Sequence, residues 1–175
     1  MRRRRSLESA GPLGAVLTLV ACGTPPPPDV TGLASDAGAF NLSGYAVKGP
    51  ISGGIVTAYK LLPDLARGDQ LATATTDDSG FFALSLPPYN GHLLLVARGG
   101  TYVEEALASA DGGQPTRLTV DVDFVGLAMD YRAGQPASAN ITRISHLAYH
   151  LARYHVRERG EAIAQAVDDA FSHLA

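Results

Sequence analysis

The chain has 175 residues, of which 18% are charged and 46% are hydrophobic, a balance that excludes a disordered polyelectrolyte, a coiled coil and a collagen-like repeat. The sequence has no Trp and a single Cys, which excludes an intramolecular disulfide and a cysteine-based metal site. The formal net charge of −3 argues against a nucleic-acid partner, because proteins that bind nucleic acids neutralise phosphates with an excess of basic residues.

The N-terminal region has the pattern of an export signal. Four consecutive arginines at residues 2–5 are followed by an apolar run from Leu13 to Ala21, far shorter than the about 20 residues that span a bilayer. A charged start, a short apolar core and small residues before a cleavage site are typical of secretory signal peptides. We therefore expect residues 1–21 to be a signal peptide that is removed.

The single cysteine lies directly after this apolar run, where residues 19–22 read Leu-Val-Ala-Cys. This tetrapeptide resembles the lipobox of bacterial lipoproteins, in which the cysteine is acylated and the chain is cleaved before it. The resemblance implies cleavage between Ala21 and Cys22, and lipidation of Cys22 by palmitate or a similar chain. Gly23 in place of Asp implies, by the rule of that family, sorting to the outer membrane. The alternative is an ordinary secretory signal followed by a chance cysteine.

Residues 22–41 are expected to form a tether. Four consecutive prolines at residues 25–28 precede a stretch that is rich in Ala, Gly, Ser and Asp. A proline run favours an extended segment of about 3.1 Å per residue, which suits a spacer between a membrane and a domain. Loss of residues 1–21, with four Arg and one Glu, leaves ten basic and sixteen acidic residues. We therefore expect the lipid rather than charge to hold the protein at the membrane.

The region from residue 42 to about 130 is expected to be a β-sandwich domain, because short apolar runs alternate there with Gly, Pro, Asp and Asn. Strands are expected at residues 54–60, 71–76, 81–86, 92–98 and 117–123. The segment 92–98 is almost continuously apolar, as in a strand that is buried on both faces. The side chains expected inside are Phe82, Leu84, Leu86, Val96, Leu118 and Val120, and alternation also points Val122 inward.

Four segments of this region carry a family resemblance. Residues 44–51, 55–59, 76–82 and 99–106 resemble motifs of the carboxypeptidase regulatory-like (transthyretin-like) domains of bacterial surface proteins. In the hairpin at 76–82, Asp side chains close the turn and Gly80 supplies a positive φ. The resemblance covers about half of the chain. It implies a mainly β, seven-stranded Greek-key sandwich, transthyretin-like or Ig-like, that binds, spaces or stabilises and usually has no catalysis.

Two amphipathic helices are expected within residues 138–175, where the apolar period becomes that of a helix. Asn140 or Thr142 can cap the first helix, and Gly160 separates it from the second. The apolar pattern is still present at Ala175, so we expect the helical part to continue in a longer natural protein. The apolar stripe of the first helix consists of Ile141, Ile144, Leu147, Ala148, Leu151 and Tyr154.

Two groups of residues offer possible metal ligands. His146 and His150 have the spacing at which two imidazoles can bind one zinc ion, but Leu147 stands where a metalloprotease has its glutamate base. Surface histidines explain this pair better. Calcium could bind six carboxylates if loops converge, although turns and solvent-facing strand positions explain them better. We therefore predict no metal and no other cofactor. The six carboxylates are those of Asp77, Asp78, Glu104, Glu105, Asp121 and Asp123.

A Lys–Asn crosslink, as in related adhesin sandwiches, is a further alternative. It would join Lys48 or Lys60 to Asn140 beside Glu104, whereas solvated lysines are the simpler interpretation.

The sequence predicts a non-catalytic lipoprotein of the bacterial cell envelope, anchored by its lipid in the outer membrane. Its sandwich would be a binding, presentation or spacer module for an envelope protein or a glycan. We expect no catalysis, because no Ser or Thr of the sandwich has an evident base partner and Cys22 is used by the anchor. The alternative is an accessory part of an envelope hydrolase or transport system whose active region lies elsewhere or beyond Ala175.

Overall fold

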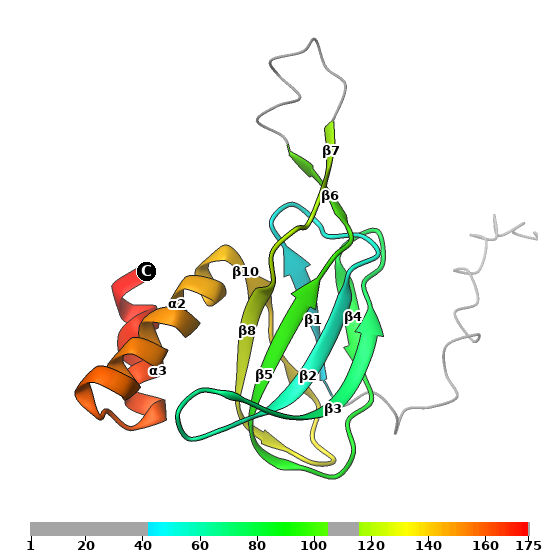
Figure 1. The fold of residues 1–175 in the computed structure, drawn as a ribbon. Helices are drawn as coiled ribbons and strands as arrows, with labels where there is room; N and C mark the ends of the chain where they lie inside the picture. Colours follow the sequence, from blue (N-terminus) through cyan, green and yellow to red (C-terminus); the bar gives the residue numbers. More distant parts are fainter. Residues whose placement is uncertain (1–41, 105–115, 175) are drawn as a thin grey trace, which may run out of the picture. The chain divides into compact units, whose positions relative to one another are not determined.

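The computed structural model describes residues 42–104 and 116–174, which form ten strands, two α-helices and one π-helical turn (Figure 1). The expected signal peptide, the lipidation site at Cys22 and the tether lie outside the described residues. The strands are β1 (Leu42–Val47), β2 (Ile55–Leu61), β3 (Arg67–Thr75), β4 (Phe81–Leu84), β5 (Asn90–Arg98), β6 (Thr101–Glu104), β7 (Thr116–Thr119), β8 (Phe124–Arg132), β9 (Ala137–Ser138) and β10 (Ile141–Thr142). The helical segments are α2 (Arg143–Tyr154), the π-helical turn η1 (His155–Arg159) and α3 (Ile163–Leu174).

The strands form two main sheets and a short ribbon. One sheet has the order β10-β1-β4, and β9 also pairs with β1; the other has the order β3-β2-β5-β8. Strands β6 and β7 pair as a two-stranded ribbon. The fold is therefore mainly β with a helical C-terminal region, as expected. The count of seven strands in a Greek-key arrangement is not confirmed, because the described strands fall into sheets of four, four and two.

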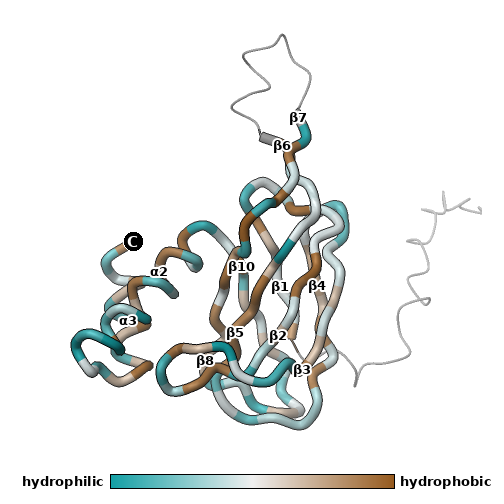
Figure 2. The backbone as a smooth tube through the Cα atoms, viewed as in Figure 1, coloured by the Kyte–Doolittle hydropathy of each residue, from teal (hydrophilic) through white to brown (hydrophobic). Residues whose placement is uncertain are grey.

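The β3-β2-β5-β8 sheet has a hydrophobic core on each face. The first core lies between the two main sheets and includes Phe82 and Leu84 of β4 and Leu93 and Leu95 of β5. The second core lies between this sheet and the two helices, and Leu94 belongs to it. Alternate residues of β5 thus enter opposite cores, which confirms the prediction of a strand that is buried on both faces. Figure 2 shows the hydrophobic residues that run along this strand.

The hairpin between β3 and β4 has the geometry that its sequence predicts. The Asp77 carboxylate accepts hydrogen bonds from the backbone N–H groups of Ser79 and Phe81, at 2.8 and 2.9 Å. Gly80 has a φ of 80°, and a Cβ there would lie 2.6 Å from the carbonyl oxygen of Ala46. A side chain at this position would therefore be strained and would also meet the neighbouring strand.

The predicted strand at residues 117–123 is partly wrong. Strand β7 ends at Thr119, and the Val122 side chain, expected inside, is 53% exposed. Val120 is buried as predicted, and Leu118 packs against the first core. The sequence alternation continues past Thr119, but strand pairing is interrupted there: Thr119 pairs with Thr101, and pairing resumes in β8, where Phe124 pairs with Ala97.

The first predicted helix is present, but the face that it buries is different. Thr142 caps α2: its hydroxyl accepts the backbone N–H of Ser145 at 3.0 Å, and the Ser145 hydroxyl accepts the N–H of Thr142 in return. Half of the expected apolar stripe is exposed, since Ile144, Leu147 and Tyr154 are 54%, 55% and 53% accessible, whereas Ile141 and Ala148 are buried. The buried face consists of Ser145, Ala148, Tyr149 and Ala152.

Small residues explain this orientation. Ala148 and Ala152 have no exposed surface and let α2 approach both β8 and α3, whereas larger side chains would hold it away. Helix α3 corresponds to the second expected helix and buries Ala166, Val167 and Ala170. Among the described helices, none has the length and hydropathy needed to cross a membrane.

Candidate functional site

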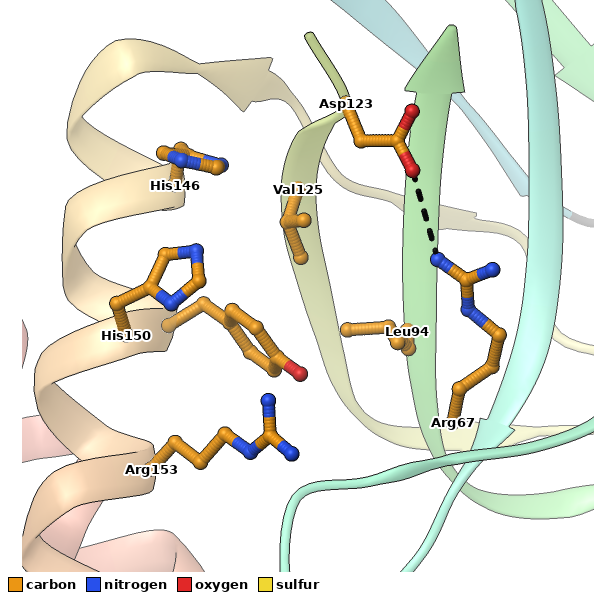
Figure 3. A pocket seen from close by; sticks show the side chains of 8 residues that line it. Arg67, Leu94, Asp123, Val125, His146, His150 and Arg153 are labelled. Atoms are coloured by element: carbon orange, nitrogen blue, oxygen red, sulfur yellow. Dashed lines mark ion pairs between the residues drawn. The ribbon is translucent and has the colours of Figure 1, made fainter.

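A pocket opens between helix α2 and the outer face of the β3-β2-β5-β8 sheet. Its volume is about 280 Å³. Leu94 and Val125 form an apolar floor on the sheet, and charged or polar side chains stand around them (Figure 3). Those on the sheet side are Arg67 and Asp123, and those on the helix are His146, Tyr149, His150 and Arg153.

Helix α2 is held over the sheet by two hydrogen bonds to backbone carbonyls. The Ser145 hydroxyl donates to the carbonyl of Val125 at 2.8 Å, and the Tyr149 hydroxyl donates to the carbonyl of Leu65 at 3.0 Å. Leu65 is fully buried in the β2–β3 loop at a φ of 58°. Both ends of the pocket wall are therefore fixed, and the side chains at positions 146, 150 and 153 face the sheet from a rigid helix.

The sheet side of the pocket carries an arginine-rich ion-pair network. Arg98 donates two hydrogen bonds to Asp123, at 2.7 and 2.8 Å, and Arg67 lies 3.7 Å from the same carboxylate. The hydrogen bond and charge of Arg98 hold the pKa of Asp123 below its usual value, and Arg67 adds to this effect. One carboxylate thus faces two guanidinium groups, which leaves a positive charge at the pocket rim.

Two nitrogen atoms on the helix side are buried without a hydrogen-bond partner among the described residues. They are Nδ1 of His146 and Nε of Arg153. A buried polar group without a partner costs about 1–3 kcal/mol, and more when the group is charged. Both atoms belong to residues that line the same pocket.

The two histidines lie against each other and against aromatic side chains. The ring centroids of His146 and His150 are 4.6 Å apart, and those of Phe124 and His146 are 5.7 Å apart, both edge to face. Burial lowers the pKa of His146, His150 lowers it further, and Asp123 raises it in part. The His146 ring is therefore neutral at pH 7 and can act as a hydrogen-bond donor or acceptor.

The structure brings together only some of the residues singled out in the sequence. His146 and His150 share the pocket. The Lys–Asn crosslink residues have other partners: Lys60 pairs with Asp69 at 2.9 Å, and Asn140 accepts from the backbone of Tyr45 at 3.0 Å. The ammonium of Lys48 contacts Tyr102.

The carboxylates considered for calcium serve other roles or fall outside the description. Asp77 closes a turn, Asp78 accepts the Ser52 hydroxyl at 2.7 Å, and Asp123 pairs with arginines. Asp121 is exposed. The side chains of Glu104 and Glu105 lie outside the described residues.

Sequence reasoning missed the arginines of the pocket. Arg67 and Arg153 are 86 positions apart in the chain, and neither belongs to a motif. Arg153 could have been placed beside His146 and His150 from helical spacing, since positions i, i+4 and i+7 share one face. The position of Arg67 follows only from the pairing of β3 with β2.

The fold and pocket define a mainly β sandwich protein with a helical layer. No family model matches the chain, and a search of curated proteins also gave no match. Among solved structures, the chain is similar to 5-hydroxyisourate hydrolase of Klebsiella pneumoniae, which has a transthyretin-like fold. The match has 21% identity, a TM-score of 0.28, and covers 58% of this chain and 88% of the hydrolase.

The match to the hydrolase corrects one prediction. The prediction of a non-catalytic protein is not kept, because the matched protein is an enzyme. The exclusion rested on the lack of a nucleophile–base pair within the sandwich, while the titratable residues gather on α2 next to the sheet. At a TM-score of 0.28, the match assigns no reaction to this chain.

Proposed function

We propose that this protein is an envelope lipoprotein that binds a small organic anion, with a carboxylate as the recognised group, in the pocket between α2 and the sheet. The observation that carries the proposal is the pair of buried nitrogens without partners, His146 Nδ1 and Arg153 Nε, in a pocket with a positive rim. Arginine presents a planar set of donors that matches a carboxylate in a bidentate way.

The size and lining of the pocket narrow the ligand class. Small-molecule pockets usually measure about 300–1,000 Å³, so a volume of about 280 Å³ suits a small acid or one acidic sugar unit. Leu94 and Val125 offer apolar contact beneath the charged groups. An acidic sugar combines a carboxylate with a flat apolar ring face, and this choice extends the expectation of a glycan ligand to a specific chemistry.

The envelope location depends on the N-terminal motifs. The signal peptide, the lipobox at Cys22 and the proline-rich tether support a domain that a lipid holds near the outer membrane. An envelope protein as a further partner stays a prediction. We also propose that the sandwich is a carboxypeptidase regulatory-like domain. The Asp77–Gly80 turn supports this assignment, because its hydrogen bonds and positive φ are those that the hairpin motif requires.

Calorimetric titration of the full-length protein in detergent tests ligand binding. Glucuronate and citrate are expected to bind, and glucose, which lacks the carboxylate, is the neutral control. Arg153→Gln should weaken glucuronate binding about 10- to 100-fold, because a hydrogen bond to a charged group contributes about 1.5–3 kcal/mol. Arg132→Gln alters an exposed arginine outside the pocket and should leave the affinity unchanged. Equal binding of glucose, or no effect of Arg153→Gln, would contradict the proposal.

Metabolic labelling with a fatty-acid analogue tests the anchor. The wild-type protein should incorporate the label and fractionate with outer membranes, and Cys22→Ala should lose both properties. Unchanged labelling in Cys22→Ala would refute lipidation without affecting the test of the pocket.

A further inference from the structure

A second cluster of titratable groups lies at the junction of α2 and α3. Donor atoms of His155, Glu161 and Asp169 all lie within 4.8 Å of one another. The His155 side chain is 6% exposed, and its Nδ1 lies 3.1 Å from Oε2 of Glu161. From this cluster we infer a binding site for one divalent transition-metal ion, with Zn²⁺ as the metal that fits the donors best.

The local backbone brings these three residues together. His155 begins the π-helical turn η1, and Gly160, at a φ of 67°, ends it and reverses the chain. Glu161 therefore returns toward His155 from the next segment, and Asp169 reaches the same place from α3. π-helical turns are frequent at functional sites, and this one places the buried His155 ring beside Glu161.

The charges of the cluster favour a cation. Two carboxylates lie beside one imidazole, and the Asp169 carboxylate has no ion pair or hydrogen bond with a side chain among the described residues. Arg159 lies 3.7 Å from Oε1 of Glu161, which leaves Oε2 directed at His155. A metal ion would compensate the two carboxylates at once.

The donor set selects among metals. Zn²⁺ binds imidazole nitrogen and carboxylate oxygen at about 2.0–2.2 Å, so tetrahedral donors lie roughly 3.3 Å apart. The His155–Glu161 separation of 3.1 Å already meets this requirement. Asp169 is exposed, so its side chain can rotate to bring the carboxylate from within 4.8 Å to the distance that a shared metal requires. Ca²⁺ and Mg²⁺ prefer oxygen ligands alone, which makes them poor competitors at an imidazole. Three protein ligands leave one position for water.

A bound metal would crosslink the end of α2 to α3, because His155 directly follows α2 and Asp169 lies within α3. The site is separate from the pocket residues His146 and His150, so this inference does not depend on the proposed function.

The test uses the full-length protein in detergent after removal of metals with a chelator. Zn²⁺ should bind with a stoichiometry of one and raise the melting temperature by roughly 5–10 °C at a hundredfold excess over its Kd. Co²⁺ should give visible absorption bands of a nitrogen- and oxygen-ligated site. Ca²⁺ and Mg²⁺ should do neither.

Asp169→Asn and His155→Gln should each weaken zinc binding by roughly 100-fold or more, since even loss of a residue that only supports a ligand costs about 10- to 100-fold. Asp168→Asn is the matched control, because it removes an exposed carboxylate next to Asp169 on the same helix. The melting temperature of each metal-free variant shows whether it folds. Because Asp169 is exposed, the Asp169→Asn variant is expected to fold. It therefore still tests the site if the His155→Gln variant fails to fold.

Three outcomes would overturn the inference. They are no zinc binding by the wild-type protein, equal binding by wild type and Asp169→Asn, and loss of binding in His150→Ala rather than in Asp169→Asn. The last result would place the metal in the pocket instead.

Discussion

The two cores of this protein are built from different kinds of residue. The core between the sheets uses large side chains such as Phe82, Leu84 and Leu93, all fully buried. The core under the helices uses small residues of the helices, among them Ala148 and Ala170, against Leu94 and Val125 of the sheet. Large side chains bury much apolar surface between backbones that lie far apart, whereas small residues let the backbones approach closely.

The polar groups that could bind a ligand lie at the helical layer rather than in the core between the sheets. The core between the sheets is almost entirely apolar. At the helical layer, the buried polar groups include Ser145 and His155, and the pocket and the His155 cluster both lie on helices α2 and α3 or beside them. Close packing of helix on sheet fixes polar side chains in place, as a binding site requires. Four predictions test this contrast.

The largest effect is expected in the core between the sheets. Phe82→Ala should lower the free energy of unfolding by about 3–5 kcal/mol, because Phe82 is fully buried and its loss leaves a cavity. The matched control is Phe81→Ala on the same strand. Phe81 is 37% exposed and contacts Tyr45, so about 1 kcal/mol or less is expected. Urea unfolding measures both, and similar losses for the two would contradict the described strand orientation.

The helical layer should instead be sensitive to added volume. Ala148→Leu should cost about 1–3 kcal/mol, since it forces a larger side chain between α2 and the sheet. Ile144→Ala, one turn earlier on the exposed face, should change stability by less than about 0.5 kcal/mol. Thermal unfolding of both variants compares the two faces. The reverse order would restore the apolar stripe as the packing face.

A single hydroxyl links the helix cap to the sheet. Ser145→Ala removes half of the capping box and the hydrogen bond to Val125, so a loss of about 1–2 kcal/mol is expected. Ser172→Ala, at an exposed position of α3, is the control and should be nearly neutral. Equal stability of Ser145→Ala and wild type would show that Ala148 and Ala152 position α2 by themselves.

The smallest effect is a pH dependence from His146. Its pKa is lowered in the folded protein, mainly by burial, and lies near 6.5 when unfolded. As the pH falls, the unfolded chain therefore binds the proton before the folded protein does. The contribution of His146 to stability is complete above about pH 6.5 and decreases as the pH falls from there to the lower pKa of the folded protein. Asp123, which faces the ring, has a lowered pKa and stays charged throughout this window. Melting temperatures at pH 7.5 and 5.5 should differ less in His146→Gln than in wild type.

The strand faces could be predicted wherever large apolar residues alternate. Phe82, Leu84 and Leu86 are buried together, and β5 is buried on both sides, as its sequence indicates. Val122 was misplaced because alternation carries no information about where pairing stops. The interruption between Thr119 and Phe124 depends on pairing with residues 97–101, more than 15 positions earlier in the chain.

The helix faces and the pocket depended on tertiary structure. A hydrophobic stripe predicts packing by the side chains with the most apolar area, and it selected Ile144 and Leu147 on α2. The sheet instead accepts the face with Ala148 and Ala152, because the close approach lets Ser145 and Tyr149 reach backbone carbonyls.

By itself, the sequence determined a mainly β chain with a helical end, the Asp77 turn and a helix cap at either Asn140 or Thr142, all of which depend on neighbours within a few residues. Only the tertiary structure decided which helix face is buried and that Arg67 and Arg153 line the same pocket. It also decided how Asp169 reaches His155. Local hydrogen bonds and side-chain alternation are encoded over short stretches, whereas these encounters depend on the packing distance between a helix and a sheet and on the reversal of the chain at Gly160.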